Sequence, residues 1–193
     1  PPPGTVFLDG ADVRDLDLRA LRRRLAVAPQ DTFLFSTTVA ENIAYGVARE
    51  DRAEVERVAR VAHLDGDVLG FPAGYDTLVG ERGITLSGGQ RQRVAIARAV
   101  LQDAPVLVLD DCLSSVDTHT EEAVLHGLRD VRRGRTTLIV SHRVSTVRDA
   151  DEIVVLEDGA VAERGAHEDL LALGGRYAEL HRRQQLEEEL EAS

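Results

Sequence analysis

An apolar run that ends in two acidic residues constrains the fold of this chain more than any other feature. Val106–Leu109 is followed at once by Asp110 and Asp111. A continuous apolar run of strand length is typical of a strand that is buried on both faces of a parallel sheet. We therefore expect an α/β fold in which two carboxylates stand at the carboxyl end of a parallel strand.

The segments around this run have the order of a parallel sheet. A helix is predicted near Thr120–Val131 and leads to a second buried strand, Thr137–Val140, which is the pattern of a βαβ crossover. Leu25–Ala28 is predicted as a further strand. The dipeptides Asp9-Gly10 and Asp158-Gly159 indicate hairpins, and so short antiparallel strands beside the parallel ones.

Helical patterns elsewhere in the chain predict helices that cover such a sheet. In Asp51–Ala62 the apolar residues form one stripe and the charges lie on the other face. Further helices are expected from Ser87 to about Leu101 and in the tail from Arg176. Phe71–Thr85 is rich in glycine and is predicted as a loop.

Composition limits the classes of function. The 193 residues suit one domain, and a net charge of -11 argues against a nucleic-acid partner. No apolar run approaches the roughly 18 residues that span a bilayer. The 23 Lys and Arg residues are all arginine and there is no Met, so we expect the chain to be a piece of a longer protein.

The segment Leu86–Gln90 is the first candidate site. Ser87 and the two glycines after it begin a predicted helix, where a hydroxyl and bare backbone N–H groups meet the positive end of the helix dipole. Such a helix start binds anions, and phosphate in particular. On its own, the segment is explained at least as well as a simple glycine turn.

The two carboxylates after the apolar run are the second candidate site. A carboxylate at the carboxyl end of a parallel strand faces the crevice in which α/β sheets bind ligands. Asp110 is suited to hold Mg²⁺ through its water shell, and Asp111 is suited to orient an attacking water. Taken alone, two acidic residues that merely end a strand are as good an explanation.

Three more polar residues complete the set. His142 leaves the strand expected next to that of Asp110, on the same edge of the sheet, where it can contact a γ-phosphate or a water. Gln30 follows Leu25–Ala28, where its amide can reach a metal or a water. Asp117 follows the double Asp and is placed near a partner surface. A lone histidine is more often an ordinary polar residue, so the argument depends on the whole set.

In this order, these residues resemble the nucleotide-binding domain of an ABC exporter, and the resemblance covers essentially the whole chain. Leu86–Gln90 matches the signature motif, and Val106–Asp110 resembles Walker B. The Q-loop, the D-loop and the switch-histidine loop are resembled by Pro29–Asp31, Ser114–Asp117 and Ser141–Arg143.

Three further stretches resemble the exporter branch of the family. Leu34–Gly46 is similar to the segment after the exporter Q-loop, Val79–Gly83 to the X-loop, and Arg143–Glu168 to the exporter C-terminal half. Importer domains and DNA-repair ATPases share the core motifs but are not expected to show all three stretches. The acidic total and the X-loop also argue against a soluble ABC ATPase that acts on nucleic acid or ribosomes.

The resemblance implies an ATPase domain that pairs head to tail with a second such domain and uses ATP and Mg²⁺. Phosphoryl transfer of this kind depends mostly on positioning and charge stabilisation. The residues that the resemblance assigns are Ser87, Gly88, Gly89, Gln90 and Asp117 for the nucleotide at the dimer interface, Asp110 and Gln30 for Mg²⁺, and Asp111, His142 and Gln30 for catalysis.

The resemblance also implies a layout for the chain. It gives a helical subdomain at about 39–101, a core formed by 1–38 and 102–175, and a C-terminal helix at 176–193. Gln30 and the loop 79–83 would contact the coupling helices of a transmembrane domain, at the cytoplasmic face of the cell membrane. The residues carry no signal for the transported substrate.

Two departures from the family pattern stand out. The phosphate-binding loop Gly-x-x-x-x-Gly-Lys-[Ser/Thr] of Walker A is absent, so we expect a truncation before these residues. Asp111 stands where active members carry Glu, as in the degenerate-site half of heterodimeric multidrug exporters, so we expect poor hydrolysis in the chain's own site. The alternative function is a non-hydrolysing fragment that depends on a partner and lends it the signature motif in trans.

Overall fold

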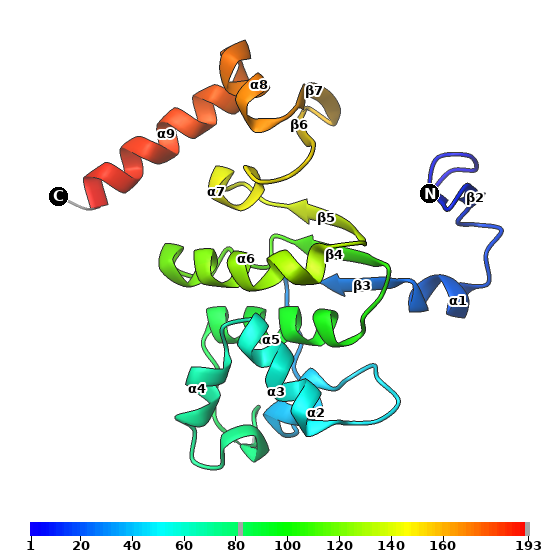
Figure 1. The fold of residues 1–193 in the computed structure, drawn as a ribbon, viewed down its shortest axis with the longest axis vertical. Coiled ribbons are helices and arrows are strands. Elements are labelled where there is room, and N and C mark those ends of the chain that lie inside the picture. Colours follow the sequence, from blue (N-terminus) through cyan, green and yellow to red (C-terminus); the bar gives the residue numbers. More distant parts are fainter. Residues whose placement is uncertain (81–82, 192–193) are drawn as a thin grey trace. The chain divides into compact units, whose positions relative to one another are not determined.

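The computed structural model describes residues 1–80 and 83–191, and it separates into two compact units, Pro1–Leu138 and Ile139–Ser193 (Figure 1). The first unit holds the signature segment and the double Asp. Its elements are β1 (Phe7–Leu8), β2 (Ala11–Asp12), α1 (Leu18–Arg23), β3 (Leu25–Ala28), α2 (Val39–Ile43), α3 (Arg52–Val61), α4 (Asp65–Leu69), the 3₁₀ turn η1 (Gly74–Asp76), α5 (Gly88–Leu101), β4 (Val106–Asp110), α6 (Thr118–Arg132) and the start of β5 (Thr136–Val140).

The parallel sheet has the strand order β3-β4-β5, so the α/β fold is confirmed and β4 is its central strand. β3 and β4 pair in parallel, with Ala26 opposite Leu107 and Ala28 opposite Leu109. These four side chains are buried, and α5 packs against both strands. The antiparallel pair of β1 and β2 is the expected N-terminal hairpin.

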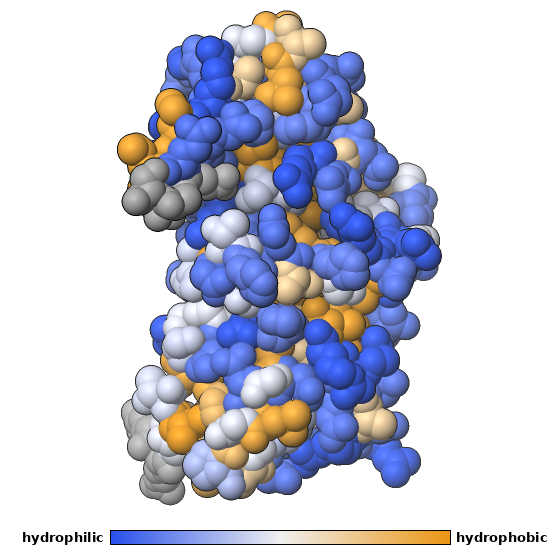
Figure 2. All heavy atoms as spheres, turned by 60° about the vertical axis from the view of Figure 1, so that its left-hand side comes forward, coloured by the Kyte–Doolittle hydropathy of each residue, from blue (hydrophilic) through white to orange (hydrophobic). Residues whose placement is uncertain are grey.

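The remaining strand residues are less covered than predicted. Val27 is 46% exposed, Leu138 is 55% exposed and Val140 is 48% exposed, and Val108 is only half-buried. The prediction of strands buried on both faces is therefore wrong. Side chains alternate across a sheet, and the described residues fully cover only the side that faces α5. Hydrophilic residues still dominate the face drawn in Figure 2, with scattered apolar ones between them.

The long helices of the first unit lie where the sequence pattern predicts them. The apolar stripe predicted for α3 is confirmed, because Val55, Val58, Ala59 and Ala62 are all 0% exposed. The sequence does not predict α4, because the segment Asp-Gly-Asp-Val-Leu is too short to show a helical period. The segment that follows is a loop, as predicted, apart from the turn η1.

One glycine allows α6 to lie against α3. A Cβ added at Gly127 would stand 2.4 Å from the carbonyl oxygen of Val61. This distance is far inside van der Waals contact, so any side chain at this position would separate the two helices.

The second unit is built around a small apolar cluster of Val144, Ile153, Leu170 and Tyr177. Both carboxylate oxygens of Glu163 accept hydrogen bonds from backbone N–H groups at the start of the last helix. In the part of the chain that the structure describes, no helix combines the length and apolar character needed to cross a membrane. The elements of this unit are the end of β5, α7 (Val144–Val147), the antiparallel strands β6 (Ile153–Glu157) and β7 (Ala160–Gly165), α8 (His167–Leu173) and α9 (Arg176–Glu191).

Candidate functional site

The signature segment begins α5 with a reciprocal pair of hydrogen bonds. The backbone N–H of Gln90 donates to Ser87 Oγ at 3.2 Å, and the backbone N–H of Ser87 donates to Gln90 Oε1 at 3.0 Å. This is a capping box, which satisfies two N–H groups at the helix start. The N–H groups of Gly88 and Gly89 lie between them, at the end of the helix that favours an anion.

The two signature glycines pack directly on the D-loop. A Cβ at Gly89 would stand 2.9 Å from the carbonyl oxygen of Ser115, and one at Gly88 would stand 3.2 Å from Ser115 Cβ. Gly89 therefore requires glycine for a reason that does not involve a ligand, and Gly88 has room for a Cβ only if the Ser115 side chain shifts slightly. The same packing fixes where the N–H groups of the helix start point.

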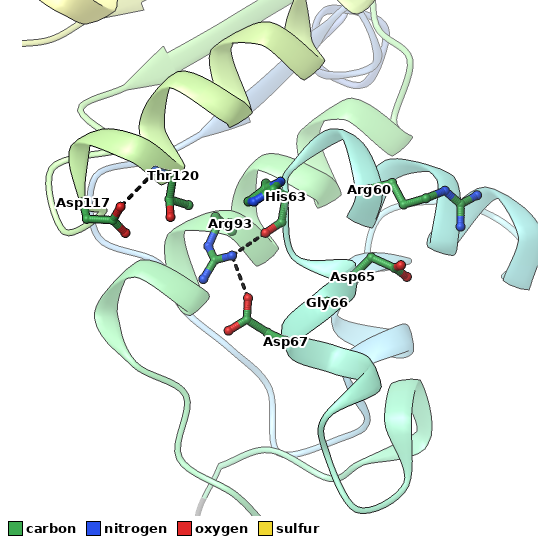
Figure 3. A pocket seen from close by; sticks show the side chains of 8 residues that line it. All are labelled: Arg60, His63, Asp65, Gly66, Asp67, Arg93, Asp117 and Thr120. Carbon is green, nitrogen blue, oxygen red and sulfur yellow. Dashed lines mark hydrogen bonds and ion pairs between the residues drawn. The ribbon is translucent and has the colours of Figure 1, made fainter.

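An ion pair holds the start of α5 to the preceding helices (Figure 3). Asp67 accepts hydrogen bonds from Gln90 Nε2 at 2.8 Å and from Arg93 Nη1 at 2.7 Å, and Arg93 also donates to the carbonyl oxygen of His63. Burial raises the pKa of Asp67, but the hydrogen bonds from Gln90 and Arg93 and the charge of Arg93 outweigh burial and hold the pKa below its usual range. Sequence reasoning missed Asp67 and Arg93, because only the fold brings them together.

The strand ends bring two of the predicted residues into contact. Gln30 Nε2 donates to Asp111 Oδ2 at 3.3 Å. This contact follows from the parallel pairing, because β3 ends just before Gln30 and β4 ends just before Asp111. Asp110 is the exposed last residue of β4. Asp111 has a φ of 43°, in the left-handed region that few residues other than glycine adopt.

The donor set at this edge fits Mg²⁺ better than a metal that needs a protein cage. Among the residues that the structure describes, no group of three or more His, Cys, Asp or Glu side chains forms a metal site. Mg²⁺ keeps several waters and binds through one or two carboxylates together with phosphates. Asp110 and the amide oxygen of Gln30 supply ligands of that kind.

Asp117 caps the next helix. Its Oδ1 accepts a hydrogen bond from the backbone N–H of Thr120 at 2.9 Å, which makes it the N-cap of α6. Hydrogen bonds from the backbone and the side chain of Thr120 lower the pKa of Asp117. The side chain also faces a polar recess of about 690 Å³, whose lining is completed by Arg60, His63, Asp65, Gly66, Asp67, Arg93 and Thr120 (Figure 3).

The predicted switch residue belongs to the second unit. The carbonyl oxygen of His142 accepts from Gln184 Nε2 at 2.7 Å, and Gln184 Oε1 accepts from the N–H of Val144 at 2.8 Å. The amide of Gln184, on α9, therefore braces the loop that carries His142. The placement of His142 beside Asp110 stays a prediction.

The predicted X-loop is described in part. Glu81 and Arg82 lie outside the described residues. Before them, the N–H of Val79 donates to the carbonyl oxygen of Thr37 at 2.9 Å, so the loop starts from a fixed point beside α2. Its contact with a transmembrane partner stays a prediction, as does the layout of helical subdomain and core.

Comparison with known proteins gives consistent matches. The family model described as "ABC transporter" matches residues 1–114. The ATP-dependent lipid A-core flippase of Vibrio cholerae serotype O1 is 50% identical over 180 residues, which are 93% of this chain and 31% of that protein. The flippase of the same name from Pseudomonas aeruginosa is 50% identical over 179 residues, 92% of this chain and 30% of that protein.

A solved structure matches over the same extent. It is described as the structure of a bacterial Atm1-family ABC exporter with ATP bound, and it superposes with a TM-score of 0.88 at 45% identity. The match covers 93% of this chain and 32% of that one. The chain thus spans about a third of the length of the proteins that it resembles.

Proposed function

The chain belongs to the ABC transporter family, and from that premise we propose that it is the ATP-binding domain of an exporter, which couples ATP hydrolysis to transport. The contact between Gln30 and Asp111 carries the proposal, because it joins the Q-loop to the residue after Walker B at the edge where α/β sheets bind ligands. The similarity to flippases and to an ATP-bound exporter supports it.

In the proposed mechanism, the residues of this chain serve two nucleotides. Ser87, Gly88, Gly89 and Gln90 present the start of α5 to the γ-phosphate of an ATP held by a second domain of the same kind. Asp117 stands next to the D-loop serines and faces the same partner. The N–H groups and the helix dipole stabilise negative charge there, and the capping box keeps them in place.

At the other nucleotide, polar residues at the sheet edge of this chain have the roles of binding the metal and positioning the water. Asp110 and Gln30 would hold Mg²⁺, which would supply charge neutralisation to the phosphates. Asp111 would orient the attacking water, and the family resemblance assigns a contact with the γ-phosphate to His142. The hydrogen bond from Gln30 keeps the carboxylate of Asp111 in one orientation before the water arrives.

The partners follow from the same proposal. A second nucleotide-binding domain completes the ATP sites, and the coupling helices of a transmembrane domain meet Gln30 and the 79–83 loop. The domain then lies at the cytoplasmic face of the cell membrane. The relatives are named lipid A-core flippases, which makes an amphipathic lipid the first substrate class to test.

An ATPase assay on the intact membrane protein that contains these residues tests the proposed function. We expect Ser87→Arg to abolish turnover, because its long side chain would fill the space in front of the N–H groups of α5. Arg19→Ala, on α1, is the control and should leave turnover unchanged. Wild-type protein without ATPase activity, or a Ser87→Arg variant with normal activity, would refute the proposal.

We further infer that the chain's own site hydrolyses ATP slowly and that its partner is a different domain with a competent site. The carboxylate of Asp111 is one methylene shorter than that of the Glu usual at this position. Asp111→Glu should therefore raise the rate constant of hydrolysis at the chain's own site by about a hundredfold, the lower end of what a positioned general base contributes. An unchanged or lower rate constant for this site, resolved as the slow phase of a single-turnover assay on the intact protein, would show that the shorter side chain suffices.

A further inference from the structure

Gln92 connects the signature helix to the D-loop. It lies on α5, just after the signature motif, and is 5% exposed. Its Nε2 donates to Ser114 Oγ at 3.0 Å, and its Oε1 accepts from the backbone N–H of Ser115 at 2.9 Å. A buried amide that uses both ends on one loop fixes that loop firmly, because each bond broken leaves a polar group unsatisfied.

The connection continues to the end of the central strand. While Ser114 Oγ accepts from Gln92, it donates to the carbonyl oxygen of Asp111 at 2.9 Å. The side chain of Asp111 in turn accepts from Gln30 at 3.3 Å. One series of hydrogen bonds therefore joins α5, the D-loop, the end of β4 and Gln30, and all of it lies within the unit Pro1–Leu138.

Packing reinforces the hydrogen bonds. Gly89 meets the carbonyl oxygen of Ser115 so closely that a Cβ there would displace the loop, and a Cβ at Gly88 would require a small shift of the Ser115 side chain. The start of α5 and residues 114–115 are thus held both by the hydrogen bonds of Gln92 and by close packing at the two glycines. A shift of one requires a shift of the other.

We propose that Gln92 is a positioning residue that makes the signature loop and the D-loop move as one body and ties both to Asp111. The inference rests on the proposed function, in which the signature serves the partner's nucleotide and Asp111 serves the chain's own. Gln92 touches neither nucleotide. It transmits the position of the signature loop at one site to the backbone of Asp111 at the other.

The test uses the intact membrane protein and compares Gln92→Glu with Ser114→Ala. A glutamate keeps the shape and still accepts from Ser115, but an ionised carboxylate cannot donate to Ser114. Each variant should lower kcat by about tenfold and change KM for ATP by less than about twofold, since a positioning loss appears in turnover. Gln102→Ala, at the other end of α5, is the matched control and should behave as wild type.

The double variant Gln92→Glu with Ser114→Ala decides whether the two residues act through one bond. We expect its kcat to equal that of the weaker single variant, whereas independent roles would multiply to about a hundredfold loss. Multiplied losses, or normal kcat in Ser114→Ala, would overturn the inference. Ser114→Ala removes only one oxygen atom, so it answers the question even if Gln92→Glu does not fold. Absence of ATPase activity in the wild type would instead overturn the proposed function, and this inference with it.

Discussion

Helices α2 and α5 begin with the same reciprocal hydrogen bonds but differ in what stands between the paired residues. In α2 the N–H of Glu41 donates to Thr38 Oγ1 and the N–H of Thr38 donates to Glu41 Oε2, both at 3.1 Å. In α5 Ser87 and Gln90 make the equivalent pair. A capping box therefore accounts for these four residues without any ligand.

The intervening residues separate the two helix starts. In α2 they are Val39 and Ala40, each 1% exposed, so side chains bury this start in the core. In α5 they are Gly88 and Gly89, which have no side chains and lie against Ser115. Ser87 and Gln90 therefore build the helix start, whereas the glycines let it pack on the D-loop and, in the proposed mechanism, leave it open to a ligand.

The largest effect on activity is expected from exchanging the residues at the second helical position. Gly89→Ala places a Cβ 2.9 Å from the carbonyl oxygen of Ser115, so the signature loop must move. A displacement of about 1 Å at a positioned group costs roughly a hundredfold in turnover, and we expect a loss of that size. The measurement is kcat for ATP in the intact protein.

The mirror substitution in α2 is the control. Ala40→Gly should cost about 1 kcal/mol of stability through helix propensity and a lost buried methyl group, and should leave kcat unchanged. Urea unfolding measures the first effect. Normal turnover in Gly89→Ala would mean that the close approach to Ser115 has no functional part, and the distinction between the two helix starts would fail.

Removal of the cap hydroxyls should have a smaller effect, and it tests whether the two helix starts differ in function as well as in stability. Ser87→Ala and Thr38→Ala each lose one N-cap hydrogen bond, worth about 1 kcal/mol, so both should lower the free energy of unfolding by similar amounts. Only Ser87→Ala should also lower ATPase activity, since in the proposed mechanism only α5 presents its start to the nucleotide. Equal activity losses in the two variants would show that they act through stability alone.

Much of this architecture was predictable from the sequence because its signals are local. The run that forms β4, the turn at Asp9-Gly10 and the stripe of α3 each fall within a few residues. The contact between Gln30 and Asp111 was predictable only through the rule that parallel strands end at one edge. The contacts of Asp67 and Gln92 were not predictable, because their bonds span 22 to 26 residues and form only when the helices pack.

The prediction that the strands are buried on both faces was wrong, and the reason is physical. An apolar run indicates that its residues are suited to burial, but it does not indicate which other elements bury them. In β3 and β4 the alternation of buried and partly exposed residues reflects the helix on one side. An alternation with a period of two residues is hard to see in a sequence when the side chains on both faces of the strand are apolar, as in β4. The sequence alone therefore did not reveal that only one face of the sheet is fully covered.

Acid is expected to have the smallest effect on the two helix starts. The capping box of α2 is closed by the carboxylate of Glu41, which titrates, whereas that of α5 is closed by the amide of Gln90, which does not. Hydrogen bonds from the Thr37 side chain and from Thr38 hold the pKa of Glu41 below its ordinary value of 4.5. A group whose folded pKa is lowered stabilises the folded state fully above the ordinary value, and that stabilisation is lost as pH falls through the folded pKa. The fall in stability below about pH 4.5 should therefore be slightly shallower in Glu41→Gln than in wild type. Parallel curves for wild type and Glu41→Gln, measured by urea unfolding from pH 6 to pH 3, would show that the bonds at Glu41 do not contribute in solution.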